Sequence, residues 1–221
     1  MDMKKATSNL FIAALLLLAI SCKKDSVNNA SNAVNADSTE GSTEYSVNTE
    51  ESVIEWTGSK QTGKHTGTLK LSEGTVYVKN NKVIGGVFTI DMNTISANDL
   101  EPDDKAQLEG HLKGTTVPEK DDHFFNVRKY PTAKFEITNV HLEQGKTLVA
   151  GNLTIKATTK NIEFPAIVSV NDRKVSIVSD SFIIDRTQWK VNYGSKTVFQ
   201  DLGDKFVNDE IELRVDVKAS R

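Results

Sequence analysis

Residues 123–135 read HFFNVRKYPTAKF and residues 151–165 read GNLTIKATTKNIEFP, and these two segments decide the expected fold. In the first, aromatic residues precede a proline and an alternating run, which predicts a buried aromatic turn that leads into a β-strand. In the second, large apolar residues occupy alternate positions on both sides of a polar connection, which predicts two more strands. This part of the chain is therefore expected to be antiparallel β-structure.

The same period of two continues along most of the chain from residue 45 onward. It is clearest near the C-terminus, where Ile211, Leu213, Val215 and Val217 alternate with charged residues. This alternation places one apolar face on each strand and directs it toward a common core.

Turn residues separate the alternating runs at hairpin spacing. Examples are Asn80-Asn81, Glu143-Gln144-Gly145 and Asn171-Asp172. We expect one all-β domain over residues 45–221, an antiparallel up-and-down β-barrel of about eight strands, because closure removes the exposed edges of a sheet. A β-sandwich with a filled core is the alternative.

One segment departs from this period. Leu108 and Leu112 lie four residues apart, acidic residues come before them, and Gly114 follows, which predicts a short amphipathic helix over residues 99–113. We expect this helix on the outside of the barrel or across its mouth. The segment after it, up to Asp122, is expected to be a loop.

The first 21 residues have the layout of a secretory signal peptide. Lys4 and Lys5 precede an apolar run over residues 10–20, and a small residue stands before Cys22. A membrane span needs about 20 apolar residues, which this run does not reach. We therefore expect residues 1–21 to be removed as a signal peptide, and an uncleaved membrane anchor is the alternative.

Cys22 is the single cysteine of the chain, so no intramolecular disulfide can form. The residues before it resemble a bacterial lipobox, in which the cysteine is lipidated and becomes the new N-terminus, although Ala19 stands where leucine is usual. We expect a cell-envelope lipoprotein attached through Cys22 to the outer membrane or to a periplasm-facing membrane, with surface exposure left open. A secreted protein with an unmodified thiol is the alternative.

Residues 22–44 are expected to form a disordered tether. They are rich in Asn, Ser, Ala, Thr and acidic residues and contain few large apolar side chains, so burial cannot offset the entropy of ordering them. Lys23-Lys24-Asp25 resembles the charged sorting signal of some Bacteroidetes surface lipoproteins, and an ordinary solvated segment is the alternative.

The charges of the chain argue against a nucleic-acid partner. Without residues 1–21 the chain has 25 basic and 29 acidic residues, a net charge of −4. The basic residues are scattered along the chain, whereas nucleic-acid binding would require them to be gathered in one cluster. A dimer is left open as the oligomeric state.

Several sequence blocks, in the same order, resemble the YceI-like family over residues 45–219. They are Trp56-Thr57-Gly58-Ser59-Lys60, Gly63-Lys64-His65-Thr66-Gly67, residues 85–92, His111-Leu112-Lys113, Ile184-Asp185-Arg186 with Trp189 and Tyr193, and Asp209-Glu210-Ile211. This chain departs from the family at Ala157 and Lys190, where glycine is frequent, and its loop over residues 114–122 is longer. The resemblance implies a lipocalin-like barrel that holds a polyisoprenoid or a similar amphiphile without catalysis and without a cofactor.

The candidate ligand-binding residues follow from the alternation and from this resemblance. They are Trp56, Gly86, Phe88, Ile90, Phe135, Leu153, Phe164, Phe182, Ile184 and Arg186. Apolar side chains suit a prenyl chain, which offers no hydrogen bonds, and Gly86 is expected to leave space for it. A dry, filled core that uses the same residues is the alternative.

Arg186 lies at the same alternate positions as Phe182 and Ile184, so its side chain is expected to point inward. Its guanidinium is expected near the barrel mouth. There it would suit a phosphate, carboxylate or quinone oxygen at the polar end of a ligand. The alternative is a structural pair with Asp91, Asp185 or another carboxylate, because an unpaired buried arginine is costly.

The sequence contains no pattern typical of an enzyme or a metal site. The four histidines, His65, His111, His123 and His141, do not have metal-ligand spacing. We find no nucleophile elbow, and Gly85-Gly86 lies within a strand rather than in a phosphate-binding loop. The alternative to lipid binding is therefore a filled barrel that displays residues 114–122 to a protein partner in the cell envelope.

Overall fold

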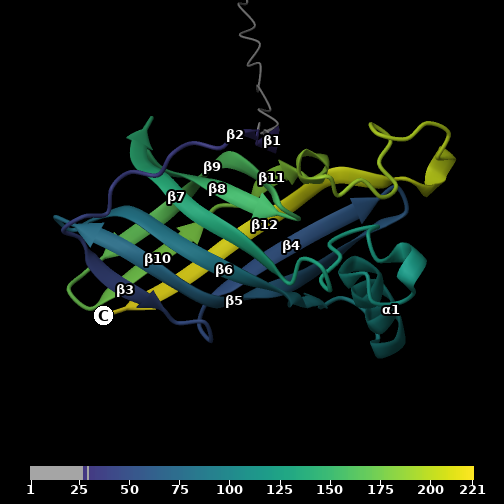
Figure 1. Cartoon of the computed structure of the whole chain (residues 1–221), viewed down its shortest axis with the longest axis horizontal. Coiled ribbons are helices and arrows are strands. Elements are labelled where there is room, and N and C mark those ends of the chain that lie inside the picture. Colours follow the sequence, from purple (N-terminus) through teal and green to yellow (C-terminus); the bar gives the residue numbers. More distant parts are fainter. Residues whose placement is uncertain (1–26, 29) are drawn as a thin grey trace, which may run out of the picture.

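Twelve strands form one continuous sheet in residues 27–28 and 30–221, which are the residues that the computed structural model describes (Figure 1). In chain order they are β1 (Val27–Asn28), β2 (Ser31–Asn32), β3 (Thr43–Val47), β4 (Val53–Lys60), β5 (Gly63–Lys79), β6 (Lys82–Ala97), β7 (Thr132–Glu143), β8 (Lys146–Ile155), β9 (Thr158–Val170), β10 (Lys174–Ser179), β11 (Phe182–Asp185) and β12 (Val207–Ser220). The helical elements are α1 (Pro102–Lys113) and three short 3₁₀ turns, η1 (Pro118–Lys120), η2 (Arg186–Trp189) and η3 (Gly203–Lys205).

The sheet closes on itself because β4 pairs with both β5 and β12. Leu213 of β12 lies opposite Trp56 of β4, which in turn lies opposite Gly67 of β5. A ring of eight strands results, in which every neighbouring pair is antiparallel. The predicted all-β, lipocalin-like barrel of about eight strands is confirmed, and the open-edged sandwich is not found.

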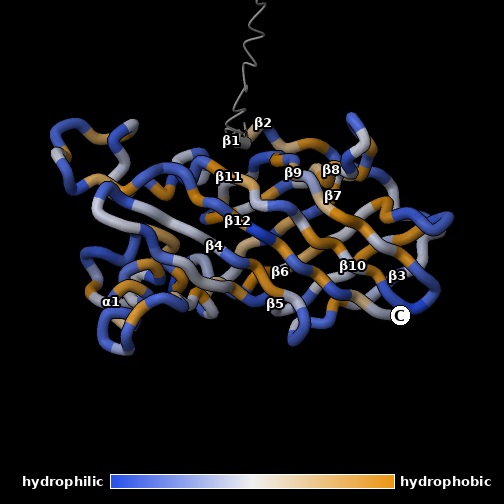
Figure 2. Tube along the Cα trace, turned by 180° about the vertical axis from the view of Figure 1, so that it is seen from behind, coloured by the Kyte–Doolittle hydropathy of each residue, from blue (hydrophilic) through white to orange (hydrophobic). Residues whose placement is uncertain are grey.

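Two positions in this wall are each filled by a pair of consecutive strands. β3 and β4 share the space between β5 and β12, and β10 and β11 lie end to end along β12. Between β3 and β4, and between β10 and β11, the chain leaves the sheet for a few residues. The long strands β5 and β12 coil around the barrel beside these pairs, as Figure 1 shows. Figure 2 shows hydrophobic and hydrophilic residues alternating along these strands, as the period of two predicts.

The hairpin turns use left-handed backbone where the chain reverses. Asn80 and Asn81 have φ of 51° and 60°, and Lys156 and Ala157 have φ of 47° and 63°. Lys190 also has a positive φ, 62°. The two departures from the family's glycines, Ala157 and Lys190, therefore lie where a Cβ costs about 1–2 kcal/mol and glycine costs nothing.

The predicted helix over residues 99–113 is present as α1. Pro102 occupies its first turn, and Gly114 ends it with φ of 70°. The carbonyl of Leu112 accepts the backbone N–H of Phe125, at 3.1 Å, and the Glu109 carboxylate accepts the N–H of Ala97, at 2.9 Å. These bonds tie the helix to the end of β6 and to the aromatic turn.

The region predicted to be a disordered tether differs from that expectation over residues 30–44. Ser31 and Asn32 pair with β9, and Thr43 already belongs to β3. The backbone of Val34 is hydrogen-bonded to the buried side chain of Asn152. A low-hydrophobicity segment is held here by backbone and amide hydrogen bonds to an existing sheet, which composition alone does not reveal.

The predicted signal peptide, Cys22 and Lys23-Lys24-Asp25 lie outside the described residues. No helix within residues 27–28 and 30–221 has the length and hydrophobicity needed to cross a membrane.

Candidate functional site

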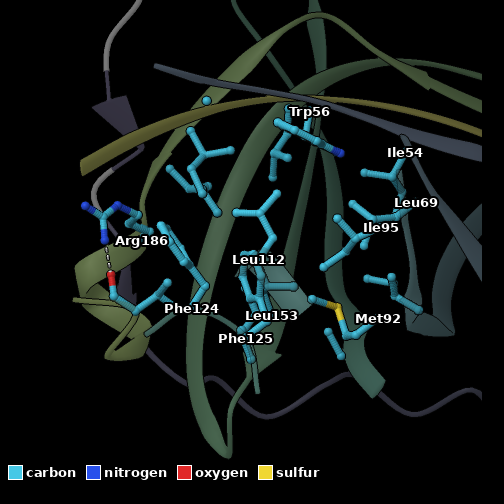
Figure 3. Close-up of a pocket in the computed structure, with 18 of the residues that line it drawn as sticks. Ile54, Trp56, Leu69, Met92, Ile95, Leu112, Phe124, Phe125, Leu153 and Arg186 are labelled. Atoms are coloured by element: carbon cyan, nitrogen blue, oxygen red, sulfur yellow. Dashed lines mark hydrogen bonds between the residues drawn. The ribbon is translucent and has the colours of Figure 1, made fainter. Parts of the chain in front are cut away.

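The barrel encloses a cavity of about 440 Å³. Its lining is mainly aliphatic and aromatic, and it comes from inward-facing positions around the barrel together with α1 and the aromatic turn (Figure 3). Nine of the ten predicted ligand-binding residues line it, namely Trp56, Phe88, Ile90, Phe135, Leu153, Phe164, Phe182, Ile184 and Arg186. The interior is hollow rather than filled, and a barrel of eight strands is wide enough to hold one small ligand.

Four phenylalanines form a continuous row along the cavity wall. The ring centroids of Phe88 and Phe135 are 6.3 Å apart, and those of Phe135 and Phe164 are 5.7 Å apart. Phe164 and Phe182 stack almost face to face, at 4.4 Å and 6° between planes. The row runs across β6, β7, β9 and β11, so one elongated apolar surface faces the cavity.

Gly86 is the one predicted residue that does not line the cavity. A Cβ built at this position would lie 3.1 Å from the Phe88 ring and 3.1 Å from Cδ1 of Ile137. The space above Gly86 is therefore occupied by those two side chains rather than by a ligand. The alternation along the strand places Gly86 on the inward face, as predicted. It does not show which neighbouring side chain fills the space beside a glycine.

Arg186 lies at the edge of the cavity, but its guanidinium is occupied by the protein. Its Nε donates to the carbonyl of Asn208 and one Nη to that of Val207, each at 3.0 Å. A further bond reaches the carbonyl of Val191, and Asp209 accepts at 3.2 Å. The Arg186 side chain is 2% exposed, and Figure 3 shows its guanidinium turned away from the centre of the cavity.

These contacts favour the structural interpretation of Arg186 over the ligand-binding one. Four of the five N–H groups of the guanidinium have protein acceptors. Burial lowers the pKa of Arg186, and the carboxylates of Asp209 and Asp185 act in the opposite direction. The paired carboxylate is Asp209, while Asp185 caps η2 by accepting from the N–H of Thr187.

The aromatic turn and α1 contribute cavity residues that were not in the predicted set. Leu108, Leu112, Phe124 and Phe125 all line the cavity. Their signal was present in the sequence, as the four-residue spacing of the leucines and as the paired phenylalanines of the aromatic turn. Of the two locations expected for the helix, the outside of the barrel or its mouth, the structure shows the second, because α1 packs across the end of the barrel (Figure 1).

A histidine pair joins α1 to the aromatic turn beside the cavity. Nε2 of His111 lies 2.9 Å from Nδ1 of His123. The His123 ring stacks on Tyr193 with centroids 4.2 Å apart, and His111 packs edge-on against Phe124. Burial lowers the pKa of His111, and the charges of His123 and Lys120 lower it further. His111 therefore favours its neutral form, whose ring has one nitrogen that donates and one that accepts.

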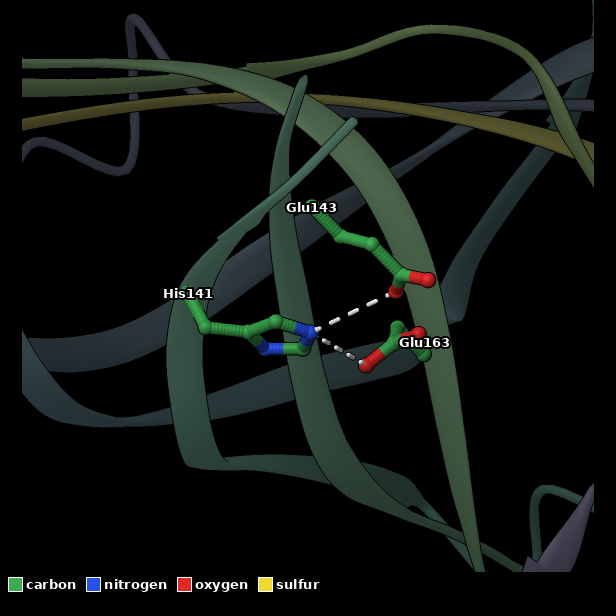
Figure 4. Close-up of side chains that lie close together, drawn as sticks. All are labelled: His141, Glu143 and Glu163. Carbon is green, nitrogen blue, oxygen red and sulfur yellow. Dashed lines mark ion pairs between the residues drawn. The ribbon is translucent and has the colours of Figure 1, made fainter. Parts of the chain in front are cut away.

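A second group of titratable side chains lies on the outer face of the barrel (Figure 4). Nε2 of His141 is 3.9 Å from the Glu143 carboxylate and 3.6 Å from that of Glu163. The three side chains are between 35% and 57% exposed, as in a solvated surface cluster. Sequence spacing could not reveal the group, because Glu163 comes from β9 and the other two residues from β7.

A family model described as the YceI-like domain matches residues 45–219 of the chain. Among solved structures, BcnA from Burkholderia cenocepacia is 20% identical with a TM-score of 0.61, and the match covers 78% of this chain and 99% of BcnA. A polyisoprenoid binding domain from Saccharophagus degradans, implicated in plant cell wall breakdown, is 12% identical with a TM-score of 0.54, and the match covers 80% and 97% of the two chains. The comparison with curated proteins finds no match.

Proposed function

Because this chain belongs to the YceI-like family, we propose that it binds a long apolar lipid, of the polyisoprenoid type, inside its barrel. The relative from Saccharophagus degradans is described as a polyisoprenoid binding domain. The proposed role is transport, storage or protection of the lipid in the cell envelope, with no chemical step.

The single observation that carries this proposal is the hollow apolar interior with its row of four phenylalanines. A hydrocarbon chain gains about 25 cal/mol for each Å² of apolar surface that it buries, so it needs no hydrogen bond to be held there. The flat rings also match the flat, branched units of a prenyl chain. A cavity of about 440 Å³ is within the range of small-molecule sites.

The polar end of the ligand is assigned to the barrel mouth rather than to Arg186. The guanidinium has protein acceptors for most of its N–H groups. Cavity-lining residues with polar ends include His65 near the start of β5, Lys205 in η3 and Asn208 near the start of β12. A ligand head placed there keeps its contact with water and leaves the buried arginine undisturbed.

Native mass spectrometry of gently purified protein tests the proposal. We expect a bound lipid of several hundred daltons that is released on mild activation, because apolar burial persists through aqueous purification. Protein that stays bare in every preparation, and that takes up no added farnesol or longer prenyl alcohol, would favour the alternative function as a protein-interaction module.

We also propose that Cys22 carries the protein's membrane attachment. The lipobox-like sequence before Cys22 supports this proposal, and the residues concerned lie outside the described part of the chain. Changing Cys22→Ala is expected to move the protein from the membrane fraction to the soluble fraction, because a lipidated N-terminus supplies the apolar attachment. Fractionation followed by immunoblotting measures this, and unchanged membrane retention would refute it.

A further inference from the structure

We propose that an N-terminal strap, residues 27–28 and 30–34, is a removable part of the barrel wall that fills a slot between β9 and β11. Its release would open the cavity sideways and let a lipid enter or leave through the wall. The gating part of this inference rests on the proposed lipid-binding function. The existence of the slot and the identity of the segment that fills it do not rest on that function, because both follow from the strand pairing.

The slot exists because β9 is longer than its neighbour β10. Only Ala166–Val170 of β9 pairs with β10. The first half of β9 pairs with β8 along one edge, and β11 pairs with β12 along one of its own edges. Among the described strands, no ladder joins the first half of β9 directly to β11.

The strap supplies hydrogen-bonding partners for both of these edges. β1 pairs in parallel with β11, with Asn28 opposite Ile184, and β2 pairs antiparallel with β9, with Ser31 opposite Asn161. Ala30, between the two short strands, is half-buried and packs against the hydrophobic core. Figure 1 shows β1 and β2 beside β11 and β9 at one side of the barrel. The occupant that the slot fits is therefore this chain's own N-terminal segment.

One buried side chain fastens the end of the strap to the barrel. Asn152 of β8 accepts the N–H of Val34 at 3.0 Å and donates to the carbonyl of Val34 at 2.7 Å. Asn161 donates to the same Asn152 oxygen at 3.1 Å, which fixes the orientation of the amide. An asparagine that meets the backbone in this two-bond geometry replaces one step of a β-ladder.

The cavity lies directly behind the slot. Ile162 and Phe164 of β9, and Phe182 and Ile184 of β11, all line it. Close to the residues that pair with the strap, the stacked Phe164 and Phe182 rings connect β9 to β11 by side-chain packing. Side chains change rotamer more easily than ladders of backbone hydrogen bonds break, so we expect this part of the wall to open more readily than parts joined by long ladders.

The strap also has the properties of a segment that opens locally. Each of its two strands contributes two paired residues, whereas β12 pairs with β4 along seven. Ser31 to Val34 are exposed, and Val34 is 51% exposed. Few buried contacts and short ladders place a segment at the low end of local stability.

A reversible cross-link tests the gate in the full chain. Directly opposed residues of an antiparallel pair have the Cα spacing that a disulfide needs, so Ser31→Cys with Asn161→Cys, in a Cys22→Ala background, locks the strap to β9. The probe is farnesol that carries a fluorescent tag. We expect the oxidised form to take up and release the probe about tenfold more slowly than the reduced form, with an unchanged Kd, because a gate slows both directions equally. Equal rates in the two redox states would overturn the inference.

Asn152→Ala tests the opposite direction. Loss of the two Val34 bonds is expected to speed probe uptake and release by about tenfold. The matched control is Asn139→Ala, an exposed asparagine of β7 whose side chain contacts His141, and it is expected to leave the rates unchanged.

Hydrogen exchange on lipid-free protein separates this inference from the proposed function. Amides of the strap, and of the first half of β9 and β11, are expected to exchange faster in Asn152→Ala than in the parent, while β5 and β6 stay protected. If the parent binds no probe, lipid binding fails, and exchange still decides whether the strap is a separable part of the wall. Strap amides as protected as those of β5 and β6 in the parent would refute a removable strap.

Discussion

Replacing Arg186 by leucine is expected to lower the free energy of unfolding by about 3–5 kcal/mol, because it removes one partner of a buried ion pair. The carboxylate of Asp209, 14% exposed, would lose its cation, and the carbonyls of Val191, Val207 and Asn208 would lose a donor. Urea-induced unfolding followed by fluorescence of the buried Trp189 measures the change.

Arg214→Leu is the matched control for this experiment. Arg214 pairs with Glu55 at 3.1 Å, but the two side chains are 49% and 50% exposed. An exposed pair contributes about 0–1 kcal/mol, so this variant is expected to unfold nearly like the parent.

A second readout separates the structural role of Arg186 from a role in binding. If Arg186 is structural, the folded fraction of the Arg186→Leu variant should lose affinity equally for prenyl alcohols and prenyl phosphates. If the variant has normal stability and loses affinity only for prenyl phosphates, Arg186 instead binds the polar end of the ligand.

Replacing Leu153 by tryptophan is expected to weaken prenyl-lipid binding about tenfold or more. Leu153 is 6% exposed and faces the cavity from β8, opposite Phe135. The larger side chain would occupy space that the lipid needs, and a loss of about 1.4 kcal/mol corresponds to a factor of ten in Kd. Because the indole enters existing empty space, we expect stability to change by less than the 1–3 kcal/mol that is typical when a packed core is overfilled.

Leu142→Trp controls for the chemistry of the substitution. Leu142 lies on the neighbouring strand β7 and is 72% exposed. It is expected to leave both affinity and stability unchanged. Titration of a fluorescent prenyl probe into both variants measures the difference, and equal affinity for the two would mean that the lipid does not lie beside Leu153.

The sequence by itself determined the class of fold and the inward direction of nine residues that line the cavity. A period of two assigns each strand residue to one of two faces, and a closed sheet has one inside face. Phe88, Phe135 and Phe164 could therefore be placed inward without knowing their neighbours. The presence of a helix in this part of the chain followed as well, because Leu108 and Leu112 repeat at a helical spacing and Gly114 supplies a stop.

The tertiary structure alone decided what each inward residue meets. Phe88 and Ile137 fill the space above Gly86, and the acceptors for Arg186 come from residues 191 and 207–209. Strand parity fixes the direction of a side chain but not the distance across the barrel, so it could not show a hollow interior. Nor could composition show that residues 30–34 lie on the wall, because their hydrogen bonds go to Asn152 and Asn161, more than a hundred positions away along the chain.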